Sequence, residues 1–229
     1  MQFALVWANL HCAGAWDVAH ALQTAMPDFD AVLERAIVLA EGSDAAQYLV
    51  DCRDKASTSG SPPQCPGLFV WLQACAIGDV NGVSLMLRAA DELGCREQLL
   101  LARDGNGLGP ALLCAASHGW LSLVQLLLSS HKQQQLGYVD PVTMDNAVLC
   151  AADGSADVLR EVLHHLSAEQ AQQQLLEEDQ YGLIALQVAS ISGNSEKVAL
   201  LLQFCPEQQV RANVAWGGCM PSRFSIHKH

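Results

Sequence analysis

The side chains best suited to chemistry in this sequence are its histidines. His164 and His165 are adjacent, and His131 lies at a comparable place earlier in the chain. Neighbouring residues on a helix point in different directions, so the pair is poorly placed to bind one metal ion. Histidines near a helix end instead favour the negative end of its dipole. We interpret the pair as a solvated helix end, and the terminal segment 227–229 (His-Lys-His) as no metal site.

The carboxylates and glycines do not form a recognisable catalytic or phosphate-binding set. Glu177, Glu178 and Asp179 precede a turn, where exposed acids are common, so we interpret them as a solvated loop. Segment 153–157 (DGSAD) lacks the later ligands of a calcium loop. The glycine-rich segment 105–109 is not followed by Lys-Ser/Thr, as a phosphate-binding loop would be. We expect no metal, no cofactor and no enzymatic activity.

The sequence contains nine cysteines and no C-x-x-C motif. Cys114 and Cys150 each precede an Ala-Ala pair, and Val188 occupies the same place in a later segment. A position that accepts Cys, Cys and Val is typical of a small buried apolar site. We therefore predict packing thiols in the cytoplasm or another reducing intracellular compartment. A disulfide framework is the alternative.

Two segments of the chain follow the same pattern. Residues 104–128 read DGNGLGPALLCAASHGWLSLVQLLL, and residues 179–202 read DQYGLIALQVASISGNSEKVALLL. Each contains a turn, a short helix of small residues, a glycine and an apolar helix that ends in three leucines. Repetition at this period indicates stacked units, because each helix pair alone leaves an apolar face uncovered.

This pattern resembles the ankyrin repeat, D-x-x-G-x-T-P-L-H-x-A-A-x-x-G-H-x-x-I-V-x-L-L-L. The resemblance implies an all-α solenoid of stacked helix-turn-helix pairs joined by extended turns. The T-P-L-H tetrapeptide of the family is absent. Its places read FVWL at 69–72, PALL at 110–113, NAVL at 146–149 and IALQ at 184–187. Apolar packing therefore replaces the hydrogen bonds of that tetrapeptide, and we expect a less regular stack.

The turn between the two helices of each unit is expected at Gly78, Gly119, Ser155 and Gly193, with Ser155 as a substitute for glycine. These residues are 41, 36 and 38 positions apart, more than the roughly 33 of an ankyrin repeat. The extra residues follow the second helix of each unit. Segment 167–170 has the pattern of a capping box, so we expect the inserts to be helix extensions or extra turns rather than irregular loops.

The chain divides into four parts by composition and pattern. Residues 1–52 are expected to form degenerate ankyrin-like or helical pairs, and residues 53–66 a linker rich in Ser, Gly and Pro. Residues 67–205 would hold about four repeats, and residues 206–229 a C-terminal tail or cap. A separate N-terminal helical module with its own partner is an alternative. The chain start lacks the basic region of a signal peptide, which makes cleavage there the weaker interpretation.

The composition favours a protein as the binding partner. The chain is 51% hydrophobic and carries a net charge of −12, which disfavours nucleic acid and anionic membranes. Its most apolar stretch, residues 111–128, is interrupted by His118, Gly119 and Gln125, so membrane insertion is not expected. A partner with a basic patch would suit the negative charge.

The ankyrin resemblance implies a non-catalytic adaptor, or a structural subunit of a larger assembly, that binds another protein through turn tips and a concave face. The alternative is the recognition arm of a larger enzyme, such as an ankyrin-bearing bacterial effector. The candidate partner-binding residues are Asp104, Asn106, Leu108, His118, Trp120, Tyr138, Asp145, Asp179 and Tyr181. For Trp120, contact with a partner and packing against the next repeat remain open. Tyr138 and Tyr181 are favoured because turn residues are usually exposed.

Overall fold

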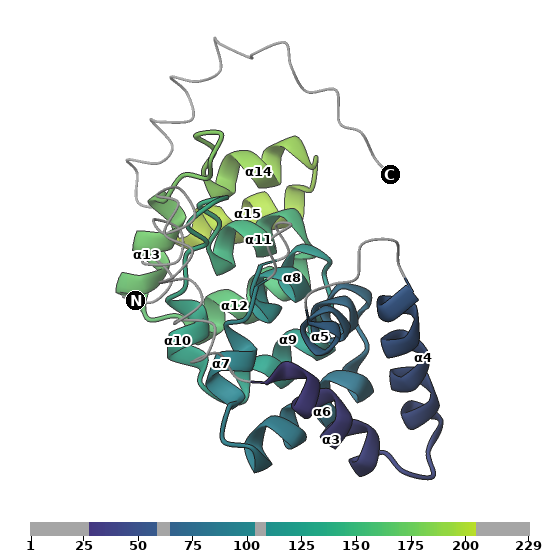
Figure 1. The fold of residues 1–229 in the computed structure, drawn as a ribbon. Helices are drawn as coiled ribbons and strands as arrows, with labels where there is room; N and C mark the ends of the chain where they lie inside the picture. Colours follow the sequence, from purple (N-terminus) through teal and green to yellow (C-terminus); the bar gives the residue numbers. More distant parts are fainter. Residues whose placement is uncertain (1–27, 59–64, 104–108, 205–229) are drawn as a thin grey trace, which may run out of the picture.

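The fold was analysed in a computed structural model, which describes residues 28–58, 65–103 and 109–204. These ranges contain helices and no strands (Figure 1), which confirms the predicted all-α class. The helices are α3 (Phe29–Leu39), α4 (Asp44–Thr58), α5 (Pro66–Ile77), α6 (Val80–Glu92), α7 (Arg96–Leu100), α8 (Ala111–Ser117), α9 (Leu121–Leu128), α10 (Lys132–Leu136), α11 (Ala147–Asp153), α12 (Ala156–His165), α13 (Ala168–Leu176), α14 (Ala185–Ile191) and α15 (Ser195–Phe204). None of these described helices combines the length and apolar character needed to cross a bilayer.

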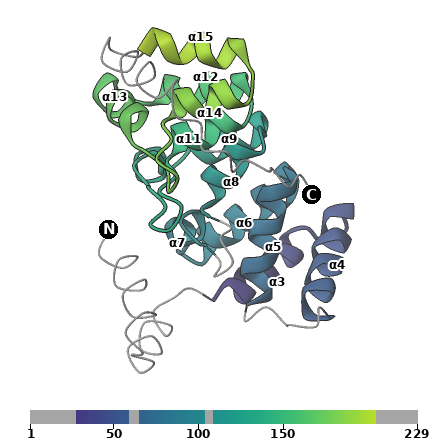
Figure 2. The same cartoon turned by 90° about the horizontal axis from the view of Figure 1, so that it is seen from above.

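Helices α5 to α15 contain four helix pairs that stack on one another (Figure 2). The first helices α5, α8, α11 and α14 contact one another in that order, and so do the second helices α6, α9, α12 and α15. Each first helix also packs on its own second helix. Ala115 and Ala116 of α8 and Ala151 and Ala152 of α11 are fully buried, and the two helices contact each other. Their small side chains let the two helices approach closely, as the sequence pattern predicts.

A short third helix follows the second helix in three units, where helix extensions or extra turns were expected. These helices, α7, α10 and α13, lie along one edge of the stack (Figure 1). The expected capping box at Ser167 and Gln170 begins α13. Gln134 of α10 donates to Glu97 of α7 at 2.8 Å, and Gln170 donates to Gln133 of α10 at 3.0 Å. The third helices are thus linked from unit to unit.

Three of the four predicted turn residues adopt the expected backbone conformation. Gly78, Gly119 and Gly193 have φ angles of 78°, 77° and 67°, in the region that favours glycine. Ser155 does not substitute for glycine, so this expectation is wrong. It has a φ of −103° and caps α12 by accepting a hydrogen bond from the Val158 amide.

The turn between α11 and α12 depends on Gly154 for a different reason. This turn holds two residues between its helices, whereas the turn between α8 and α9 holds three. Gly154 has a φ of −68°, outside the left-handed region that favours glycine. A Cβ atom added to it would lie 2.0 Å from the carbonyl oxygen of Ala116 in the preceding pair. The glycine is required here by close approach of two backbones.

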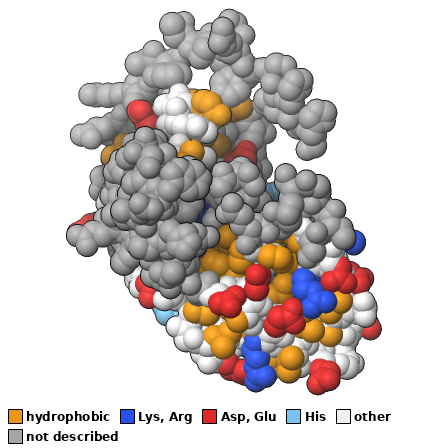
Figure 3. All heavy atoms as spheres, viewed as in Figure 1, with side chains coloured by type: hydrophobic (Ala, Val, Ile, Leu, Met, Phe, Trp, Pro, Cys, Tyr) orange, Lys and Arg blue, Asp and Glu red, His pale blue; other side chains and the backbone are white. Residues whose placement is uncertain are grey.

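Helices α3 and α4 extend the core in a different order from the later pairs. The first helix of this pair, α3, packs most extensively on α6, a second helix, while α4 packs on the first helix α5 and on α3. Phe29 and Leu33 of α3 belong to the same buried cluster as the later units. Over α3 and α6, acidic and basic side chains alternate with apolar ones (Figure 3), and Arg35 pairs with Glu92 at 2.5 Å.

The boundary predicted between the N-terminal part and the array is shifted. Residues 53–58, expected in the linker, continue α4, because Arg53 pairs with Glu34 of α3 at 2.9 Å and Ala56 is buried. Residues 59–64 of that linker lie outside the described residues, and α5 begins at Pro66. The pair expected within residues 1–27, and the tail from residue 205, also lie outside them.

Candidate functional site

Two turn tips precede the first helices α11 and α14, and each is organised by an aspartate. In the tip at 138–146, the Asp140 carboxylate accepts from the amides of Val142 and Thr143 at 2.8 and 3.1 Å. It is buried and lies 3.5 Å from the guanidinium of Arg103. In the tip at 178–184, Asp179 shapes its turn by accepting from the amides of Tyr181 and Leu183, each at 2.8 Å. Asp179 therefore has a structural role in its turn.

The two tips contact each other through the backbone. The amide of Gln180 donates to the carbonyl of Thr143 at 2.9 Å. This bond brings together two tips with exposed apolar side chains: Val142, Met144 and Tyr181 are 58%, 47% and 65% exposed. Met144 also has a φ of 59°, a left-handed conformation that is costly for a residue other than glycine. The tips thus present a short apolar surface to solvent.

A pocket of about 130 Å³ lies between α8 and the tip at 138–146. It brings together His118 and Asp145, two of the residues predicted from the sequence. His118 is exposed at the end of α8, and its Nδ1 atom lies 2.9 Å from the carbonyl oxygen of Cys114. The pocket is lined by Gly109, Leu113, Cys114, Ser117, His118, Asp140, Thr143, Asp145 and Cys150.

The Asp145 carboxylate lies in a negative environment. Partial burial raises its pKa, and the carboxylates of Asp179, Asp140 and Asp153 raise it further, while a hydrogen bond with Thr143 lowers it. A carboxylate whose charged form is disfavoured in this way would be stabilised by a cation entering the pocket. The one guanidinium at this tip among the described ion pairs, that of Arg103, already pairs with Asp140.

The thiols that line the pocket are packing residues, as predicted. Cys114 and Cys150 are both the fourth residue of a first helix, and both are buried. Burial, followed by neighbouring carboxylates such as Asp145, raises the pKa of Cys150 well above its usual value. A thiol in this state is a poor nucleophile.

Trp120 packs between two units. Its Nε1 atom donates to the carbonyl of Ala76 at 2.9 Å, and a Cβ atom added to Gly78 would lie 2.6 Å from its ring. The indole therefore packs against the preceding pair, whereas the sequence analysis considered packing against the next repeat. Trp120 remains 41% exposed.

The remaining candidate residues fall into three groups. Tyr181 is exposed at its tip, as expected. Tyr138 was expected to be exposed, but it is half-buried against the core. At this residue the chain passes from α10 into the tip and runs beside the core. Residues Asp104, Asn106 and Leu108 lie outside the described residues.

His164, His165 and Glu177, which were considered for chemistry, lie at helix ends. His164 and His165 lie in the last turn of α12, and His165 is 3.2 Å from Glu161. Glu177 accepts a hydrogen bond from Asn146 at 2.9 Å. Within the ranges that the structure describes, no three metal-binding side chains are grouped closely enough to hold an ion.

Lys197 is a buried residue that the sequence analysis did not identify. Its Nζ atom donates to the carbonyls of Ala152, Asp153 and Gly154 at 2.6, 3.1 and 3.1 Å. It thereby caps the C-terminal end of α11 from the next pair. Burial lowers the pKa of Lys197, and the charge of Asp153 opposes this effect. The sequence did offer a signal for a buried lysine. Lys197 lies beside the apolar run of α15, at the position that the apolar residue Val158 occupies in α12.

The sequence was also compared with known proteins. No model of a protein family matches it, and a search of curated proteins gave no significant match.

Proposed function

We propose that this chain is a non-catalytic interaction module that binds another protein along its turn tips and the adjoining ends of α8 and α11. The observation that supports it most directly is the exposed apolar surface of Val142, Met144 and Tyr181, next to the pocket that contains Asp145. Apolar residues exposed together, with polar groups at their border, are typical of protein-binding surfaces. The ankyrin resemblance points to the same surface.

The chemistry of this surface favours a partner segment with both apolar and basic side chains. The apolar part would cover Tyr181 and Met144, and a lysine or arginine would enter the pocket at Asp145. Electrostatic attraction would raise the association rate and weaken as salt rises, since the Debye length is about 10 Å at 0.1 M. The apolar contacts would govern dissociation.

The proposal can be tested by affinity capture with purified protein as bait and quantitative mass spectrometry of the captured proteins. Tyr181→Ala combined with Met144→Ser is expected to weaken the binding of a specific partner tenfold or more. A tenfold loss of affinity corresponds to ~1.4 kcal/mol, about the contribution of a single interface anchor. Gln125→Ala, on the exposed side of the second helix α9, serves as the matched control and should retain it.

A captured partner then allows a kinetic test. Asp145→Asn should slow association at low salt and flatten its dependence on salt, with a smaller effect on dissociation. If Gln125→Ala weakens binding and the tip variants do not, the partner uses the face of the second helices and the proposal is wrong.

A further inference from the structure

Each junction between units places a group of the later pair against the end of the preceding first helix. At the first junction, Trp120 covers Gly78 and donates to Ala76. At the second, Ser155 lies against Gly119, within 3.3 Å of where a Cβ would stand. At the third, Lys197 donates to the carbonyls that end α11. At each junction the following unit therefore covers the turn glycine, the last carbonyls of the first helix, or both.

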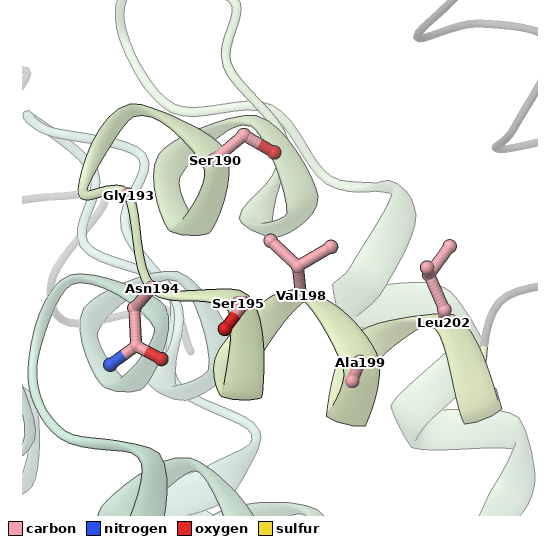
Figure 4. A pocket seen from close by; sticks show the side chains of 7 residues that line it. All are labelled: Ser190, Gly193, Asn194, Ser195, Val198, Ala199 and Leu202. Atoms are coloured by element: carbon pink, nitrogen blue, oxygen red, sulfur yellow. The ribbon is translucent and has the colours of Figure 1, made fainter.

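The corresponding place in the last unit is open among the described residues. A Cβ atom added to Gly193 would meet no atom within 4 Å. Beside it is a pocket of about 420 Å³, the end pocket, in which Val198 of α15 points toward Ser190 of α14 (Figure 4). The end pocket is lined by Ser190, Gly193, Asn194, Ser195, Val198, Ala199 and Leu202.

The apolar residues of the end pocket occupy positions that are buried in the other units. Val198 and Leu202 lie four and eight positions after the N-cap of α15. The residues at those positions in α12, Leu159 and Leu163, are 0% and 3% exposed. Leu202 is 45% exposed. An unfilled apolar surface of this kind favours an occupant with a large apolar side chain.

The chain that follows α15 resembles an earlier segment that leads along the side of the stack. Residues 205–212 read CPEQQVRA, and residues 95–102 read CREQLLLA. The two share the cysteine, the Glu-Gln pair and the alanine at equal spacing. Residues 96–100 form α7, the third helix of the first unit. The sequence after α15 therefore shares its spacing of Cys, Glu-Gln and Ala with the segment that contains α7.

We propose that the end pocket binds the indole of Trp216 of this same chain. Trp216 lies twelve positions after Phe204, a reach of up to ~40 Å in extended chain. The ten residues of α15 span only ~15 Å, so Trp216 can return to the pocket. The indole would stack on Gly193 and donate its N–H to a terminal carbonyl of α14, as Trp120 does at the first junction.

Hydrogen exchange of the full chain, read by mass spectrometry, tests this proposal at concentrations where sedimentation gives a monomer. Trp216→Ala should speed exchange about tenfold in residues 193–202, because local opening becomes easier when the pocket is vacated. Ala199→Glu, a change at an exposed position in the pocket, should speed exchange around residue 216 in turn. Phe224→Ala, which removes another aromatic of the same tail, is the matched control and should change neither segment.

Two results would overturn the proposal. One is unchanged exchange in residues 193–202 for Trp216→Ala in a protein whose helical circular dichroism is intact. The other is protection of the end pocket only in a sample that sediments as a dimer, which would assign the pocket to a second copy. Partner capture through the tips is a separate measurement, so failure here leaves the proposed function unaffected.

Discussion

At the scale of single residues, the polar groups that matter most join sequence-distant backbones. Lys197 and Trp120 each donate to carbonyls of the preceding pair, more than forty positions away in sequence. Helix ends leave carbonyls without partners, and these side chains supply them from the next unit. Asp145 differs from both, because its charge is disfavoured where it stands. Under the proposed function, Asp145 is the residue that a basic group of the partner would approach.

Asp145→Asn is expected to stabilise the protein at pH 7 by on the order of 0.5 kcal/mol. The folded-state pKa of Asp145 is raised, chiefly by burial. Its favourable contribution is therefore present below the unfolded-state pKa, about 4, and is lost as the pH rises through the folded-state value. The gain of the variant should vanish below about pH 4, where the carboxyl group is protonated in both states. Urea unfolding across pH measures this difference.

The matched control for that variant is Glu178→Gln, an exposed carboxylate near the second tip. Glu178→Gln should leave the unfolding free energy nearly unchanged both at pH 7 and below about pH 4. A loss of stability for Asp145→Asn at pH 7 would show that the carboxylate is favourable where it stands, which contradicts the negative environment inferred for the pocket.

At the scale of the helices, the turns show how two physical reasons lead to the same residue type. Gly193 is required for its backbone angle, and Gly154 for the closeness of Ala116. Ser155 illustrates why a single repeated pattern misled the sequence analysis. Counted from the start of the first helix it occupies the glycine position, but the shorter turn makes it the cap of the second helix.

Gly154→Ala and Gly193→Ala should therefore differ in cost. At Gly154 the new Cβ would overlap the Ala116 carbonyl, so α8 and α11 must separate, with an expected loss of ~3 kcal/mol or more. At Gly193 a Cβ meets no described atom within 4 Å, so apart from the proposed Trp216 contact only the positive φ is unfavourable, with an expected loss of about 1 kcal/mol. Chemical denaturation of both variants measures these losses. Equal losses would contradict the steric explanation.

Much of the helical arrangement was predictable because its causes are local in sequence. The capping box at Ser167 and the buried thiols at Cys114 and Cys150 follow from patterns a few residues long. Contacts across units follow no such pattern. The role of Lys197 and the side on which Trp120 packs depend on which helix ends meet in space. Of the candidate residues, His118 and Asp145 line one pocket, a proximity that the sequence did not predict, and the half-buried state of Tyr138 was not foreseen either.

At the scale of the whole molecule, one buried cluster runs from α3 to α15. The alternative of a separate N-terminal module is difficult to reconcile with this continuity, because α3 supplies the cover of α6 and part of α5. The described residues therefore form one stack. In its first pair the order is reversed, because α3 packs on the second helix α6 and α4 packs on the first helix α5.

Leu33→Ala is expected to destabilise the stack well beyond α3. Leu33 is 1% exposed, and truncating a buried leucine costs roughly 2–5 kcal/mol. Hydrogen exchange should become faster in α6 as well as in α3. Val38→Ala on the same helix, at a position that is 53% exposed, is the control and should change stability by less than about 0.5 kcal/mol. Faster exchange confined to α3 and α4 would support a separate N-terminal module.

The contact at Gly154 also bears on which inherited variants of this protein can persist. Every other amino acid carries a Cβ atom, so any missense change at this codon places an atom where the Ala116 carbonyl now lies. A small replacement such as alanine or serine causes the same Cβ clash with the Ala116 carbonyl as a large one. Codon 154 should consequently be among the least variable in a population, and substitutions that do survive there should be accompanied by changes around residue 116 that widen the gap between α8 and α11.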